Sequence, residues 1–191
     1  MSEPRLALLR PADLSGAQQE LYDELCSGPR ADAGRPAGPV DAEGRLTGPF
    51  NAMLLSPAVG APLQRLGAAL RYASDLDPVV RELAILAVAA HHDSAYERAA
   101  HRRVATRLGI SGTALDAVEA GEVPAEHPEA APALELVRRL LSADLPDDAA
   151  YDRLRTALGE AGLFEVSTLV GYYSTVATQL ALFGVTPGGS R

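Results

Sequence analysis

Ser94, Glu97 and His101 are spaced in a way that could support acid–base chemistry. They are separated by three and four positions, which on a helix places all three side chains on one face. A carboxylate beside an imidazole fixes its tautomer and raises its pKa, which suits proton transfer near neutral pH. The same spacing fits an ordinary surface Glu–His pair, so the residues alone leave both interpretations open.

Arg81 and Glu82 are the charged residues of a second segment, 79–91, that is otherwise apolar on nearly every side. A helix of this kind is expected to be buried, and a charge buried within it is costly without a partner. We therefore expect Glu82 to meet a cation, a histidine or a hydrogen-bond donor. Alternatively, both side chains reach water near the helix start, where the helix dipole stabilises a glutamate.

Other catalytic signatures are missing from the sequence. His91 and His92 could join Glu97 and His101 around a metal, but there is no His-Glu-x-x-His motif and no cysteine ligand, so we expect no metal. Neither a Gly-rich phosphate loop nor a nucleophile elbow is present. The single cysteine, Cys26, has no basic neighbour at helical spacing that would activate its thiol. The sequence therefore predicts a site that works without a cofactor.

Composition narrows the class of protein further. The 191 residues carry a formal net charge of −8 and no dense basic block, which argues against a nucleic-acid partner. A single cysteine excludes an internally disulfide-stapled domain. No apolar run is long enough for a membrane span, and no signal peptide is evident, so the expected location is the cytoplasm.

The elements that must position these residues are all predicted to be helices. A Pro- and Gly-rich stretch over 28–48 predicts a long loop, and we expect a short helical piece at 48–55 and a frayed tail at 184–191. Caps and apolar periodicity predict the remaining helices. These are expected at residues 12–27, 56–73, 79–91, 93–108, 111–121, 129–143, 147–161 and 163–183.

The segment 81–90, followed by Ser94-Ala95-Tyr96-Glu97 and then His101, resembles the core motif of the carboxymuconolactone decarboxylase and alkylhydroperoxidase D superfamily. Flanking stretches at 48–57, 109–111, 117–121 and 169–173 extend the resemblance over roughly residues 45–183. It implies an N-terminal extension over 1–44 and a family domain over 45–191. It also implies an all-α, alkylhydroperoxidase D-like bundle of about seven to eight helices that forms homo-oligomers, either trimers or hexamers.

In the peroxidase branch of this superfamily the second helix reads Cys-x-x-Cys-x-x-x-His. The matching positions here are Ser94, Glu97 and His101, and the branch's relay glutamate matches Glu82. Both thiols are thus replaced, and disulfide exchange cannot run without them. The resemblance therefore implies the decarboxylase-like branch rather than a thiol peroxidase.

By resemblance we expect a lyase, decarboxylase or isomerase acting on a small carboxylated lactone or related organic acid. His101 would be the general acid or base, Glu97 would orient it, and Glu82 would relay a proton or balance charge. Expected substrate-binding residues are Arg81, Ser94, Tyr96, Phe50, Asn51, His92 and Tyr172. One alternative is an oligomeric small-molecule binder that has lost its activity; another is an oxidoreductase that uses Cys26 between subunits.

Overall fold

The computed structural model describes residues 5–27 and 39–187, and these residues are mainly helical. An isolated bridge between Val40 and Leu46 is the nearest approach to a strand within the described ranges. The expected all-α class is therefore confirmed. The helices are α1 (Gly16–Ser27), α2 (Pro49–Met53), α3 (Pro57–Tyr72), α4 (Pro78–His91), α5 (Ala95–Arg107), α6 (Gly112–Glu119), α7 (Ala131–Leu141) and α8 (Asp148–Phe183), with 3₁₀ turns at Pro11–Asp13 and Pro128–Ala130.

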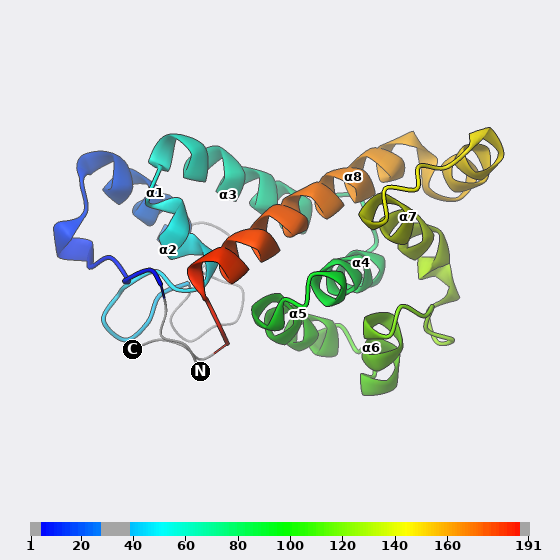
Figure 1. Ribbon diagram of the computed structural model, residues 1–191, viewed down its shortest axis with the longest axis horizontal. Helices are drawn as coiled ribbons and strands as arrows, with labels where there is room; N and C mark the ends of the chain where they lie inside the picture. Colours follow the sequence, from blue (N-terminus) through cyan, green and yellow to red (C-terminus); the bar gives the residue numbers. More distant parts are fainter. Residues whose placement is uncertain (1–4, 28–38, 188–191) are drawn as a thin grey trace. The chain divides into compact units, whose positions relative to one another are not determined.

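The chain forms two compact units. Of the described residues, one unit contains those at 5–27, 39–73 and 178–187, and the other contains residues 74–177. The long helix α8, drawn from yellow to red in Figure 1, therefore contributes to both. The expected family boundary between residues 44 and 45 stays a prediction, because compact units do not define the limits of a family domain.

The first unit is built on α1, α2 and α3. Its core contains Leu21, Leu25 and Leu46. The backbone N–H of Leu9 donates to the side-chain oxygen of Asn51 at 2.9 Å, and the Asn51 amide nitrogen donates to the carbonyl of Ala7 at 3.0 Å. Asn51 thus ties the N-terminal segment to α2. Of the predicted loop, residues 28–38 lie outside the described part of the chain.

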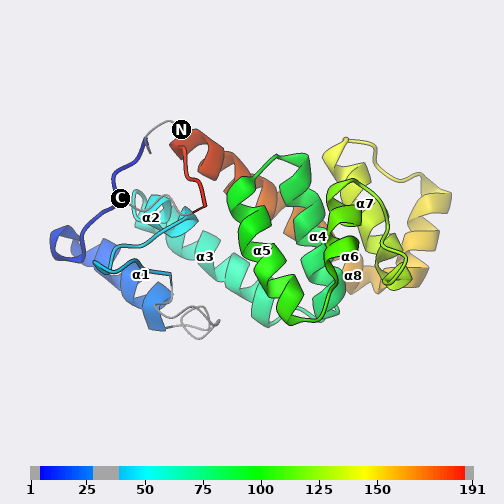
Figure 2. The same cartoon turned by 90° about the horizontal axis from the view of Figure 1, so that it is seen from below.

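In the second unit, α4 packs against α5, α6 and α7, and α4 and α5 lie side by side in both Figure 1 and Figure 2. The Asp77 carboxylate caps α4 by accepting from the backbone N–H groups of Val79 and Val80, as Asp preceding Pro at a helix start predicts. The middle of the helix is mostly buried, with Leu83 and Leu86 fully shielded. Glu82 is therefore carried into the interior.

Several helix ends agree with the signals in the sequence. Gly109 follows α5 with a φ of 87°, a conformation that glycine adopts without strain, and the Ser111 hydroxyl accepts from the N–H of Ala114. The predicted break near residue 162 is displaced. It occurs at Gly159, which has φ 71° and ψ 168°, a backbone conformation that a glycine adopts readily because it has no Cβ.

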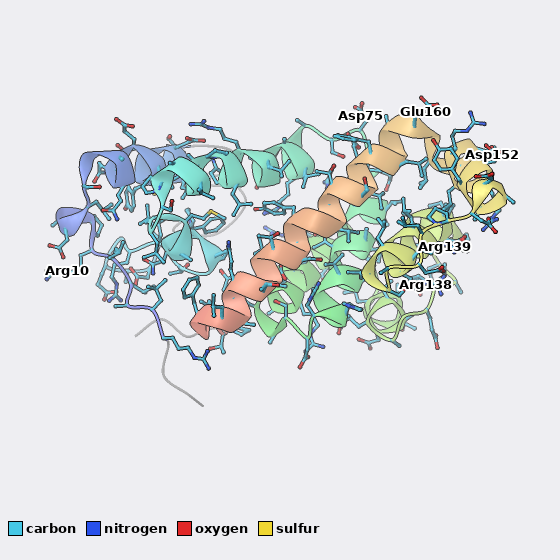
Figure 3. The ribbon with its side chains drawn as sticks, turned by 45° about the horizontal axis from the view of Figure 1, so that its top comes forward. Arg10, Asp75, Arg138, Arg139, Asp152 and Glu160 are labelled. Atoms are coloured by element: carbon cyan, nitrogen blue, oxygen red, sulfur yellow. The ribbon has the colours of Figure 1, made fainter. Side chains whose placement is uncertain are left out.

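Glu135 of α7 forms two surface ion pairs, one within α7 and one to the first part of α8. The Glu135 carboxylate accepts from Arg139 at 3.1 Å and from Arg153 at 2.7 Å; Figure 3 labels Arg139 on the ribbon that carries this group. These side chains remain partly exposed, so each pair contributes little to stability. Among the described residues no helix has both the length and the apolarity to cross a bilayer.

Candidate active site

Glu82 and His101 form a buried hydrogen bond between α4 and α5. The distance between His101 Nδ1 and Glu82 Oε2 is 2.7 Å, and the two residues are 6% and 1% exposed, respectively. When the Glu82 carboxylate is ionised it can only accept, so His101 Nδ1 then donates this hydrogen bond. The expectation that Glu82 meets a histidine is confirmed, and the solvent-exposed alternative is wrong for Glu82.

Tyr173 of α8 packs against the His101 ring. The ring centroids are 5.2 Å apart at an interplanar angle of 88°, and Tyr172 meets Tyr173 in a similar edge contact at 5.0 Å. Tyr173 is buried and was not among the predicted site residues. Apolar periodicity assigns it to the core, and only the adjacent pair of tyrosines in an apolar helix hints at a further role.

Glu97 lies on α5 one turn before His101, but it does not bond to it. The predicted Glu97–His101 hydrogen bond is wrong, because the imidazole Nδ1 faces Glu82 on α4 instead. Glu97 is 3% exposed and neither carboxyl oxygen has a hydrogen-bond partner among the described residues. The carboxylate that bonds to the His101 ring is therefore Glu82.

Burial raises the pKa of Glu97 from its ordinary value of 4.5 to about 8, because an ionised carboxylate is poorly solvated in the interior. The neighbouring Ser94 hydroxyl opposes this rise, although no bond of good geometry joins the two groups: the Ser94 oxygen is also buried without a partner. At neutral pH the Glu97 side chain is thus mainly an uncharged carboxylic acid.

Arg81 precedes Glu82 on α4 and is half-buried. Its Nε is buried without a hydrogen-bond partner, and no ion pair links it to any other described residue. A guanidinium in this state has unused capacity to bind a carboxylate.

The remaining predicted residues are spread over both units. His92 Nε2 lies 2.9 Å from the Ser174 hydroxyl, and burial, followed by the neighbouring His91, lowers the pKa of His92. Tyr96 is half-buried on α5. Phe50 and Asn51 belong to the first unit, so their binding roles stay predictions, and the Asn51 amide is already bonded at both ends.

His91, which the sequence suggested as a metal ligand, is exposed at the end of α4. Within residues 5–27 and 39–187, no three or more His, Cys, Asp or Glu side chains are grouped so that they could hold a metal ion.

The described residues form an all-α protein in which a buried carboxylate bonds to an imidazole, an aromatic ring packs against that imidazole, and a separate buried carboxyl group has a raised pKa. Residues 57–139 match the model of the carboxymuconolactone decarboxylase family, and this match supports the resemblance drawn from the sequence. The match runs from the start of α3 into α7 and includes Glu82, Glu97 and His101. No curated protein matches the chain.

Proposed function

We propose that this protein is a cofactor-independent acid–base enzyme of the lyase, decarboxylase or isomerase type. Its substrate would be a small carboxylated lactone or a related organic acid. The observation that carries the proposal is the 2.7 Å bond between Glu82 and His101, both almost fully buried. Glu97, on the same helix as His101, is a second buried carboxyl group, and it is neutral. Glu82 and Glu97 are thus buried carboxyl groups in two different environments, which is typical of acid–base sites.

In the proposed reaction, His101 moves the proton. Loss of CO₂, or of a proton, from carbon next to an unsaturated carbonyl leaves an electron pair that spreads onto the carbonyl oxygen. The imidazolium of His101 then delivers a proton to carbon, and Glu82 balances the charge of the imidazolium. Arg81 would attract the substrate carboxylate, which fits its lack of an ion pair within the described chain.

The test is a turnover screen of unsaturated lactone acids with the native protein and two histidine variants. His101→Gln should lower kcat by roughly 10²- to 10⁴-fold, the usual contribution of a positioned acid or base. His127→Gln is the matched control, because His127 also pairs with a glutamate, Glu129, but in a pair whose Glu129 side chain is 55% exposed. Equal turnover by native protein and His101→Gln would refute the proposed role.

The alternative of a non-catalytic binder has a distinct outcome in the same screen. Saturable binding of a lactone acid by the native protein, with no turnover of any compound tested, would favour it. Such binding would still depend on Arg81, whereas the His101→Gln variant would bind as well as the native protein.

The predicted trimer or hexamer is also part of the proposal. Leu55, Val59 and Leu66 are exposed at or on α3, at 49%, 66% and 41%, and exposed apolar side chains of this kind commonly lie in subunit contacts. Light scattering of the purified protein checks it: a mass three or six times that of the chain is expected, and a monomer at micromolar concentration would contradict it.

A further inference from the structure

Ser94 and Glu97 place two unsatisfied polar groups on the face of α5 that carries His101. Ser94 is 8% exposed and Glu97 is 3% exposed, and the Ser94 hydroxyl and both Glu97 oxygens have no hydrogen-bond partner among the described residues. Buried polar groups in folded proteins are nearly always paired, because an unpaired one loses its bonds to water without replacement. Two such groups on one helix face therefore indicate a place for a ligand atom.

The charge state of Glu97 limits what that atom can be. His101 lies one turn along α5 from Glu97, and it contacts Glu82 from α4 and Tyr173 from α8. Burial and Ser94, rather than any of these groups, set the pKa of Glu97 at about 8. Glu97 therefore holds a proton at neutral pH, and it can donate a hydrogen bond that an ionised carboxylate could not.

We propose that Ser94 and Glu97 form a hydrogen-bonding subsite for the carbonyl oxygen of an enolisable carbonyl compound. Both hydroxyl groups donate to this oxygen, and they do so most strongly when it becomes an enolate. This inference rests on the proposed function, and it names the part of the substrate that the Ser94–Glu97 face recognises. A cationic ligand is disfavoured, because binding it would require Glu97 to lose its proton in the interior.

The subsite has a defined part in the reaction. When the bond from carbon to CO₂ or to hydrogen breaks, its electron pair forms a new C=C bond and the carbonyl oxygen takes the negative charge. Glu97 keeps its proton and donates a hydrogen bond to that oxygen. The electron pair returns to carbon when His101 delivers a proton there. A fixed donor in a site without water is worth far more to the transition state than to the uncharged substrate.

The test uses 4-nitrophenol, whose anion carries charge on an oxygen attached to an unsaturated carbon, like an enolate, and whose absorbance reports its ionisation. Native protein should bind the anion at pH 7 and lose affinity above pH 8, where Glu97 ionises and repels it. Glu97→Gln keeps an uncharged donor, so it should bind the anion without this loss above pH 8. Glu97→Leu and Ser94→Ala should each bind roughly 10- to 100-fold more weakly.

Two exposed residues of α8 provide matched controls. Glu160, labelled at the outer side of α8 in Figure 3, and Ser167 are both exposed, and Ser167 bonds only to the carbonyl of Phe164 on its own helix. The variants Glu160→Gln and Ser167→Ala should bind 4-nitrophenol as the native protein does. Equal weakening by these controls and by Glu97→Leu would overturn the subsite.

A second measurement does not depend on variants that fold poorly. In protein labelled with ¹³C at glutamate carboxyl groups, the Glu97 signal is identified as the one missing from Glu97→Gln. It should titrate near pH 8, and 4-nitrophenol should shift that titration upward, because the bound anion favours the protonated acid. Benzylamine, a cationic ligand, is the comparison. A Glu97 titration that 4-nitrophenol does not shift would overturn the proposal, and so would a downward shift together with preferential binding of benzylamine. These measurements report binding, so they test the subsite independently of the loss of turnover in His101→Gln, which tests the proposed function.

Discussion

Glu82 and Glu97 are both almost fully buried, but their neighbours differ. Glu82 bonds to an imidazole, whereas Glu97 has no hydrogen-bond partner within the described chain. A buried ion pair costs a great deal to desolvate, and removing one member leaves the other uncompensated. The Glu82–His101 pair is therefore expected to be kept for chemistry rather than for stability, and this distinction can be measured.

Replacing Glu82 with leucine should destabilise the protein by about 3–5 kcal/mol, because the partner is left buried and unpaired. The double variant Glu82→Leu/His101→Leu should recover most of that loss, since two apolar side chains of similar volume need no compensation. Chemical denaturation of the native protein, both single variants and the double variant gives the coupling energy. A double variant that is as unstable as the sum of the singles would show that the pair acts through shape alone.

The sequence predicts that Glu82, Glu97 and His101 belong to one site, but it does not predict which of the two carboxylates bonds to the imidazole. Spacing on one helix shows that Glu97 and His101 share a face, and the apolar surroundings of Glu82 show that it needs a partner. Which carboxylate reaches the imidazole depends on how α4 and α5 pack, and no local pattern contains that information. Tyr173 was missed for the same reason: a periodic apolar helix does not distinguish a core ring from one that contacts a histidine.

At the scale of elements, α8 makes two adjacent contacts that hold the site. Tyr173 meets the His101 ring and the next residue, Ser174, bonds across to His92 at the end of α4. The nearby Thr175 hydroxyl instead bonds back to the carbonyl of Gly171 on its own helix. The two cross-helix contacts fix the rotation of α8 about its axis, because neighbouring helical side chains point about 100° apart.

Tyr173→Leu should cost about 1 kcal/mol beyond the lost area, the usual value of an aromatic pair, and should change the imidazole NMR signals of His101. Tyr173→Phe should preserve both. Ser174→Ala should shift the His101 signals in the same direction but less, while the matched Thr175→Val leaves them in place. If Ser174→Ala and Thr175→Val gave the same spectrum, the His92 contact would have no part in positioning the ring.

The packing of α2 on α3 depends on Gly60. A Cβ added at this position would lie 2.3 Å from the backbone oxygen of Met53, so backbone would have to move. Gly60→Ala should therefore destabilise the first unit by about 1–3 kcal/mol or more. Gly171→Ala is the control, because a Cβ there meets nothing within 4 Å and should stabilise α8 by about 1 kcal/mol. Thermal unfolding measures both, and a neutral Gly60→Ala would mean that α2 can shift freely.

Helices were easier to predict from sequence than the joins between them. Asp77 with Pro78, Gly109 and Ser111 mark helix ends by local backbone chemistry, and each acts as expected. The break inside α8 was misplaced because Gly159 and Gly162 are both adequate signals, and only tertiary packing selects the first. Local capping is readable from sequence, whereas a choice between two equivalent glycines is not.

At the scale of the whole molecule, Glu97 links stability to pH. Its folded pKa of about 8 lies above its ordinary value of 4.5, so between these values the folded state binds more protons than the unfolded state. The free energy of unfolding must then fall as pH rises through this window, by up to about 1.4 kcal/mol for each pH unit. Below pH 4.5 the group has no effect, and above pH 8 the full penalty is present. Other groups act in the opposite direction: Arg65 lowers the pKa of Glu24, which favours the folded state at higher pH.

The contribution of Glu97 is therefore isolated by comparing native protein with Glu97→Gln, which cannot ionise. The difference in the free energy of unfolding should be small at pH 4.5 and should grow in favour of the variant up to about pH 8, then stay constant. Urea denaturation at pH 4.5, 6, 7, 8 and 9 measures it, with the exposed Glu160→Gln variant as the control that shows no such trend. A difference that does not vary with pH would mean that Glu97 is already ionised in the folded protein. In that case the buried carboxyl would not be the neutral donor on which the carbonyl subsite depends.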